Sequence, residues 1–186
     1  MSEMNGFGRW LVNLRTESRG KRILASLSPD LQLIPSSKVL ELGAGRGGLL
    51  ALVFERFHPA RIVGTDYDAA QVSAAEKFLS GRWGRIPPSV ELRTADAAEL
   101  PFPDTSFDYV FAMSMLHHVD KSPSTYLRRP LALREVRRVL KPGGQFIYSD
   151  FSHRAELRAT LAELGFVPVR KRSRWGHDLA IYRAPN

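Results

Sequence analysis

The chain has 186 residues, of which 44% are hydrophobic and 25% charged, with a formal net charge of +8 and no cysteine. This balance is typical of one soluble globular domain and excludes collagen-like, coiled-coil and disordered proteins. The missing thiols exclude disulfides, thiolate metal sites and cysteine nucleophiles.

The first 36 residues predict a helical extension, which Pro29 and Pro35 interrupt. The segment from Met1 to Asn13 mixes polar with apolar residues and lacks the apolar core of a signal peptide. The longest wholly apolar run, Leu49 to Phe54, is too short to cross a bilayer. We therefore expect a cytoplasmic protein.

After residue 36, short apolar strands alternate with amphipathic helices. Strands are expected at 38–42, 61–66, 89–93, 107–113, 144–149, 166–169 and 179–182. Helices are expected at 49–57, 69–79, 131–140 and 155–164. This alternation predicts a mostly parallel, doubly wound α/β sheet. We expect one domain, with an extension at 1–36, a cofactor-binding core at 37–151 and a closing helix and hairpin at 152–186.

Doubly wound sheets bind ligands at the carboxyl ends of their strands, where the strand order reverses. The loop after the first predicted strand fits the pattern G-x-G-x-x-G with Gly43, Gly45 and Gly48. Glycine has no Cβ, so the backbone can turn sharply and lie against a ligand. A tight turn without any ligand is the simpler interpretation of the same glycines.

Acidic residues follow the next two strands. Asp66 lies about 20 residues beyond the glycines, where a carboxylate accepts ribose hydroxyls, and Asp68 suits the cap of the following helix better. Tyr67 is placed to pack on adenine, and Asp96 to accept its amine. Each also fits an ordinary turn or surface position. Glu41 would repel a pyrophosphate, so three converging acids favour a cationic, phosphate-free cofactor.

These residues carry a resemblance to a known family. Residues 39–47, VLELGAGRG, resemble the first motif of class I S-adenosylmethionine-dependent methyltransferases, which are Rossmann-like. Segments similar to that family's later landmarks follow in the right order at 64–67, 96–110, 115–119 and 140–144. The resemblance covers 38–150 and is nearest to the type 11, ubiquinone/menaquinone-biosynthesis-like branch.

The resemblance implies a seven-stranded sheet of order 3-2-1-4-5-7-6, with the last strand antiparallel and helices on both faces. It implies that S-adenosyl-L-methionine is the cofactor and S-adenosyl-L-homocysteine the product. The cofactor-binding residues it implies are Glu41, Gly43, Ala44, Gly45, Gly47, Asp66, Tyr67, Asp96, Ala97 and Met113. Glu41 and the glycine loop would hold the methionine end, Asp66 the ribose, and Asp96 with Ala97 the adenine.

His117 and His118 lie just past the fourth strand, near the expected entrance of the methyl acceptor. A sulfonium methyl is already electrophilic, so alignment of the reactants is the main contribution, worth ~7–11 kcal/mol. Imidazole titrates near neutral pH, so either histidine could act as a general base, and we favour His118. A packing or capping role is the simpler interpretation. Adjacent histidines lack metal-ligand spacing, so we expect no metal.

Basic residues gather at 121–141 and 170–174. They form either solvated faces, the interpretation that we prefer, or a surface that attracts nucleic acid. The leading hypothesis is SN2 methyl transfer to a small-molecule acceptor. The alternatives are an RNA or protein methyltransferase that uses the basic face, an NAD-dependent oxidoreductase and a non-catalytic cofactor-binding protein.

Overall fold

The computed structural model describes residues 20–21, 23–25, 27, 29–120, 126–174 and 177–186. These residues form a seven-stranded sheet in the order β3-β2-β1-β4-β5-β7-β6, as expected from the resemblance. The strands are β1 (Lys38–Leu42), β2 (Arg61–Asp66), β3 (Val90–Thr94), β4 (Phe107–Met113), β5 (Leu140–Asp150), β6 (Val167–Arg174) and β7 (His177–Arg183). Strands β1 to β5 pair in parallel, and β7 is antiparallel to both β5 and β6.

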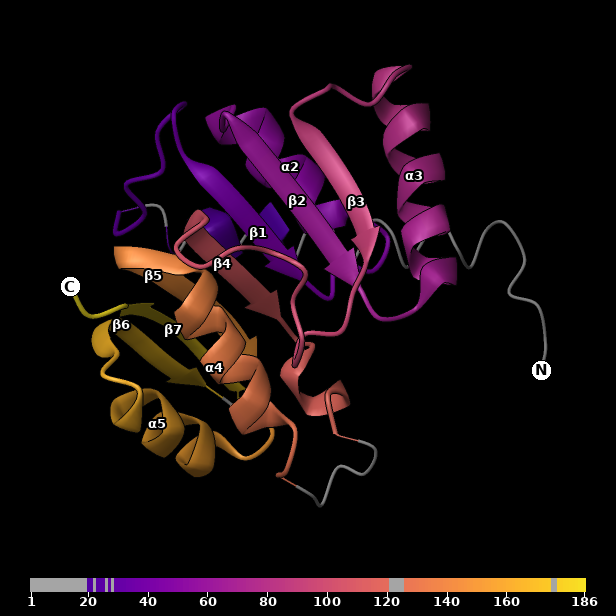
Figure 1. The fold of residues 1–186 in the computed structure, drawn as a ribbon. Helices are drawn as coiled ribbons and strands as arrows, with labels where there is room; N and C mark the ends of the chain where they lie inside the picture. The colour runs from indigo at the N-terminus through magenta and orange to yellow at the C-terminus, as the bar shows by residue number, and fades with distance from the viewer. Residues whose placement is uncertain (1–19, 22, 26, 28, 121–125, 175–176) are drawn as a thin grey trace.

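Helices cover both faces of the sheet. They are α2 (Gly48–Phe57), α3 (Ala69–Trp83), α4 (Arg129–Val139) and α5 (Arg154–Glu163), with a short 3-10 turn, η1, at Leu116–His118. Figure 1 shows α4 and α5 in front of the sheet and α2 behind it. Because side chains alternate along a strand, Leu40 packs in a core with α4 and α5, while Val39 packs in a second core with α2 and α3.

The predicted amino-terminal extension is helical over its described residues between 20 and 27. Leu24 and Leu27 of this stretch are buried in the second core, together with Leu31 and Leu33. Residues 1–19, 22, 26 and 28 of the extension lie outside the described residues.

Three elements extend four or five residues beyond their predicted ranges, while the other differences are of one or two residues. Helix α3 continues to Trp83, whose indole N–H donates to Glu55 Oε1 of α2 (2.9 Å). Strand β5 begins at Leu140 rather than Gly144, since Leu140 already pairs with Phe107 of β4. Strand β6 extends through a cationic stretch to Arg174, because its backbone pairs with β7 along the whole length. Cross-strand pairing therefore overrides the local turn and charge signals.

The strand order of the sheet indicates where a ligand site should lie. Strand β1 lies between β2 and β4, so the chain order reverses there, and the carboxyl ends of β1 to β4 meet at one edge. A crevice at such a reversal is where open α/β sheets bind ligands. No described helix has the length and apolar character needed to span a membrane.

Candidate active site

A cavity of about 810 Å³ opens at the carboxyl ends of β1 to β4. The loops that follow these four strands supply most of its lining. Of the residues predicted to bind a cofactor, six line it: Gly43, Gly45, Asp66, Tyr67, Asp96 and Ala97. His118 also lines the cavity, whereas Glu41, Ala44, Gly47, Met113 and His117 are not among its lining residues.

The glycine loop forms one wall. Gly43 and Gly45 have φ angles of 63° and 52°, in the left-handed region that favours glycine. The loop is tied to β2 because Ala44 N–H donates to the carbonyl of Thr65 (2.8 Å). A Cβ at Gly43 would lie 2.6 Å from Cβ of Met115, so glycine is required there. Met115 was not among the predicted site residues, although its place just after β4 is a signal for such a role.

Asp66, at the end of β2, is held by backbone donors. Its Oδ2 accepts from Gly45 N–H (2.9 Å) and its Oδ1 from Asp68 N–H (3.0 Å). Its own carbonyl accepts from Ala95 N–H (2.9 Å), which joins the ends of β2 and β3. Each carboxylate oxygen keeps a second lone pair for a ligand. The carboxylate is therefore fixed in orientation and can still accept hydroxyl groups.

Asp68 and Tyr67 follow Asp66 into helix α3. Asp68 accepts from Ala70 N–H (2.8 Å) and caps the helix, as its position in the sequence predicted. Tyr67 is 78% exposed and lines the cavity, so a flat ligand group could cover its ring.

Glu41 is buried at the end of β1, with 5% of its surface exposed, and its Oε2 has no hydrogen-bond partner. Burial raises the pKa of its carboxyl to about 8, with a further contribution from Asp66 and an opposing one from the backbone N–H of Leu50. At neutral pH this carboxyl is mostly protonated. The structure thus brings Asp66 and Asp96 together in the cavity lining and keeps Glu41 outside it.

Asp96, in the loop after β3, has both carboxylate oxygens engaged. Its Oδ1 accepts from Ala98 N–H (2.9 Å), and its Oδ2 forms an ion pair with the guanidinium of Arg128. Arg128 also lines the cavity, and it comes from the residues just before α4. In the sequence, Arg128 stands out only as part of a basic stretch.

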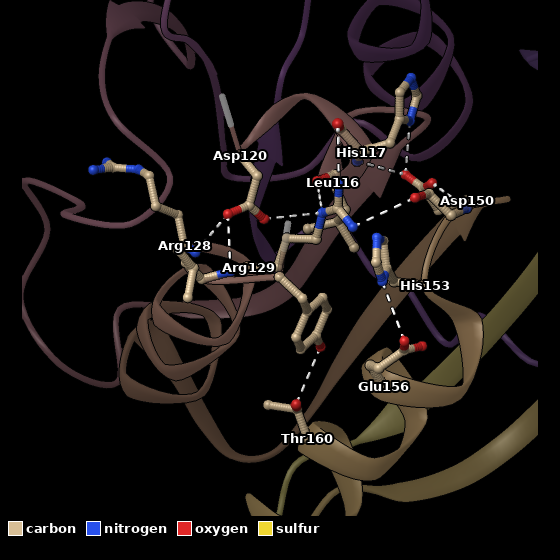
Figure 2. A network of polar contacts seen from close by, with 12 residues as sticks. Leu116, His117, Asp120, Arg128, Arg129, Asp150, His153, Glu156 and Thr160 are labelled. Carbon is tan, nitrogen blue, oxygen red and sulfur yellow. Dashed lines mark hydrogen bonds and ion pairs between the residues drawn. The ribbon is translucent and has the colours of Figure 1, made fainter. Parts of the chain in front are cut away.

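The two predicted histidines lie in η1 and play different parts. Figure 2 shows His117 beside Asp150, whose Oδ2 lies 3.1 Å from His117 Nδ1 and accepts from the backbone N–H of His117 (3.2 Å). The ring of His118 packs on that of His117, with centroids 4.0 Å apart. Burial, and then the charge of His117, lowers the pKa of His118 despite the opposing effects of Asp150 and Asp66. His118 is therefore mostly neutral at pH 7.

A buried ion pair between Arg129 and Asp120 stabilises η1. Arg129 is fully buried, and its Nε lies 3.2 Å from Asp120 Oδ2 and donates to the carbonyl of Leu116 (2.9 Å) (Figure 2). The Asp120 Oδ1 accepts from the backbone N–H groups of Leu127 (2.9 Å) and Arg128 (2.8 Å). The expectation of a solvated basic face was thus wrong for Arg129, because no local sequence spacing reveals its partner Asp120.

Among the residues that the structure describes, no cluster of three or more metal-binding side chains is found. The described acidic and basic side chains that line the cavity are four aspartates, His118 and Arg128. This arrangement suits a ligand with hydroxyl and amine donors and positive charge.

Comparison with known proteins agrees with the fold. The family described as "Methyltransferase domain" matches residues 40–148. A phthiotriol/phenolphthiotriol dimycocerosates methyltransferase of Mycobacterium tuberculosis is 35% identical over 136 residues, which are 73% of this chain and 46% of that protein. A ubiquinone/menaquinone biosynthesis C-methyltransferase of Desulfotalea psychrophila is 31% identical over 140 residues, 75% of this chain and 50% of that protein. The chain thus spans about half the length of these relatives.

Among solved structures, the chain is similar to a putative methyltransferase in a complex with the Haloferax volcanii Trm112 methyltransferase activator. The TM-score is 0.74 at 20% identity, and the match covers 100% of both chains. At this level of identity the likeness shows the fold alone.

Proposed function

Because the chain belongs to the family of methyltransferase domains, we propose that it uses S-adenosyl-L-methionine to methylate a small-molecule acceptor. The observation that carries this proposal is the charge of the cavity. Four aspartates line it, Asp66, Asp68, Asp96 and Asp120, against a single described Lys or Arg, which is Arg128. Asp96 is paired with Arg128 and Asp120 with the buried Arg129, so the net negative charge comes from Asp66 and Asp68. A pyrophosphate would be repelled there, and a cationic nucleoside attracted. This charge balance also counts against a nicotinamide dinucleotide.

The residues present fit the proposed cofactor. We assign the ribose hydroxyls to Asp66, whose oxygens keep free lone pairs, and the adenine to Asp96, Ala97 and the exposed ring of Tyr67. The methionine end falls to the glycine loop, with the unpartnered Oε2 of Glu41 as a nearby acceptor. When bound, the cofactor supplies a methyl group on a positively charged sulfur. The roles of Ala44, Gly47 and Met113 stay predictions.

We assign the acceptor side of the cavity to His118, Met115 and Val119. A neutral His118 can take a proton from an acceptor hydroxyl, amine or carbon as the methyl group is transferred. His117, held by Asp150, packs on His118 and limits the movement of its ring. His118 is therefore the candidate base, and His117 its support.

The names of the relatives favour a small, apolar acceptor. The two reported above are named for lipid and quinone biosynthesis, so we propose an acceptor of comparable chemistry and a cytoplasmic enzyme. Methylation of RNA or protein is the second candidate, and it predicts RNA affinity that falls steeply with salt. A scaffold without activity would bind the cofactor and methylate no acceptor.

Replacement of Asp66 tests the proposal. Asp66→Ala should weaken binding of S-adenosylmethionine at least about tenfold in calorimetry, because two hydroxyl bonds to a charged acceptor are lost. The matched control is Asp68→Asn, which removes a charge from the same cavity while asparagine still caps α3. Unchanged affinity in Asp66→Ala would refute the ribose assignment. Tight NADH binding without S-adenosylmethionine binding would favour the oxidoreductase.

A further inference from the structure

Arg128 reaches across the cavity to the carboxylate that we assign to adenine. Arg128 precedes α4, which packs on one face of the sheet in a core with β4 and β5. Asp96 follows β3, the edge strand that β2 and β1 separate from β4. Their ion pair uses Asp96 Oδ2, and the other oxygen, Oδ1, already accepts from Ala98 N–H. Each oxygen thus has one protein partner before any ligand binds.

The backbone of Arg128 is anchored, so the reach of its side chain is set by the fold. Its N–H donates to Asp120 Oδ1 (2.8 Å), and Asp120 in turn pairs with the fully buried Arg129 (Figure 2). By contrast, the guanidinium end is partly solvated, with side-chain exposures of 42% for Arg128 and 28% for Asp96. A fixed base and a solvated tip allow the pair to open without disturbing α4.

We propose that Arg128 competes with the cofactor's adenine for Asp96, so that this ion pair must open before the nucleoside is fully bound. The inference rests on the proposed function, which gives Asp96 to the adenine amine. Oδ2 of Asp96 keeps a second lone pair, but Arg128 and Asp96 both line the cavity, so the guanidinium occupies the space beside this carboxylate that the adenine would need. Arg128 is then a residue that tunes cofactor affinity from the acceptor side of the cavity.

The size of the effect follows from the exposure of the pair. Ion pairs this exposed are weak, so removing the competitor should tighten ligand binding by about two- to five-fold. The opposite sign is also physically meaningful. If the guanidinium instead stacked on the bound adenine, its removal would weaken binding.

Calorimetric titration with S-adenosylhomocysteine measures this without knowledge of the acceptor. Arg128→Met should bind the nucleoside about two- to five-fold more tightly than the wild type. Arg61→Met is the matched control, because the Arg61–Glu91 pair has similar exposures of 39% and 31% and its residues do not line the cavity. That variant should bind with unchanged affinity. Arg128→Gln serves as a second variant should Arg128→Met unfold.

The dependence of affinity on salt gives a second readout. From about 0.01 M to about 1 M salt the Debye length falls from about 30 Å to about 3 Å, which weakens the exposed pair. The affinity of the wild type should therefore rise toward that of Arg128→Met, whose own affinity should change less.

The outcomes separate the two proposals. Tighter binding in Arg128→Met that disappears in an Asp96→Asn background supports the competition. A wild type that binds S-adenosylhomocysteine while Arg128→Met binds equally or less tightly overturns it and leaves the proposed function standing. A wild type with no affinity for the nucleoside overturns both.

Discussion

The burial of Glu41 makes the stability of the fold depend on pH. Its carboxyl is buried with one oxygen unpartnered, and burial raises its pKa to about 8. In the unfolded chain the same group ionises near 4.5. Between these two pH values the folded chain therefore holds a proton that the unfolded chain has lost.

This difference sets a pH dependence of stability. The free energy of unfolding should fall as pH rises from about 4.5 to about 8, by at most about 1.4 kcal/mol per pH unit, because the folded state binds more protons in that window. Glu41→Gln keeps the shape and cannot ionise, so its stability should decline less over the same range. Urea unfolding curves at several pH values measure this.

Glu55 provides the control of opposite sign. The hydrogen bond from Arg82 lowers the pKa of the Glu55 carboxyl. Its stabilising contribution is thus present above the ordinary pKa and is lost as the medium becomes acidic. Glu55→Gln should destabilise the chain near neutral pH and should leave the Glu41 slope in place. Equal slopes in Glu41→Gln and the wild type would contradict the assignment.

At the residue scale, the sequence predicted which carboxylates gather and missed how they are paired. Asp66 and Asp96 follow strands whose order is fixed by the fold, so their meeting could be foreseen. The contacts Asp96–Arg128 and Asp120–Arg129 join residues that share no helix or strand, and no sequence periodicity predicts them. Glu41 was expected in the cavity, but its side chain is buried, accepts from the backbone N–H of Leu50 and is not among the lining residues.

The element that defines the site is the loop between β1 and α2. Two of its glycines share a left-handed backbone and differ in their surroundings. A Cβ at Gly43 would meet Met115 at 2.6 Å, whereas a Cβ at Gly45 would have nothing within 4 Å. The pair therefore separates backbone strain from steric overlap.

Alanine at each position should show this difference. Gly45→Ala should cost about 1–2 kcal/mol, the price of a left-handed alanine. Gly43→Ala should cost about 1–3 kcal/mol more, because the new methyl group overpacks against Met115. Chemical unfolding gives both values, and a Gly43→Ala/Met115→Ala double variant should recover little, since the contact is made by Cβ of residue 115. Equal costs for the two alanines would contradict the close approach.

Element boundaries were predicted well for three apolar strands and for the capped start of α3. Strands β1, β2 and β4 match the predicted ranges, and Asp68 caps α3 as expected. The hairpin was predicted too short, because Arg170 and Lys171 resemble a charged loop when their pairing with β7 is unknown. Such a pairing depends on the whole sheet and not on local composition.

At the scale of the molecule, the net charge of +8 does not describe the surface that binds ligands. Basic residues from both positive stretches are paired with acids: Arg128 with Asp96, Arg129 with Asp120, Arg138 with Asp104 and Glu135, Lys141 with Asp108, and Arg170 with Asp30. Lys121 of the same stretches lies outside the described residues. These pairs leave less free positive charge for nucleic acid than the sequence suggests, which favours the small-molecule proposal.

The division of the chain into segments at residues 36 and 151 stays a prediction. We propose that the segments on either side of residue 151 fold as one cooperative unit. Residues 145–150 of β5 pair with 178–183 of β7, so the closing segment completes the sheet. Leu157, Leu161 and Phe166 of that segment are buried in the core shared with α4. We expect residues 37–151 to depend on 152–186 for stability.

Removal of residues 152–186 should therefore abolish cooperative unfolding, because β5 would become an exposed edge strand and one core would lose its cover. A graded test accompanies the truncation, since a fragment can fail for other reasons. Leu161→Ala should cost about 2–5 kcal/mol in the full chain, whereas Val167→Ala, at a side chain 61% exposed, should change stability by no more than about 0.5 kcal/mol. Circular dichroism during urea titration measures all three. A truncated chain that unfolds in one sharp transition would show that the core stands without its hairpin.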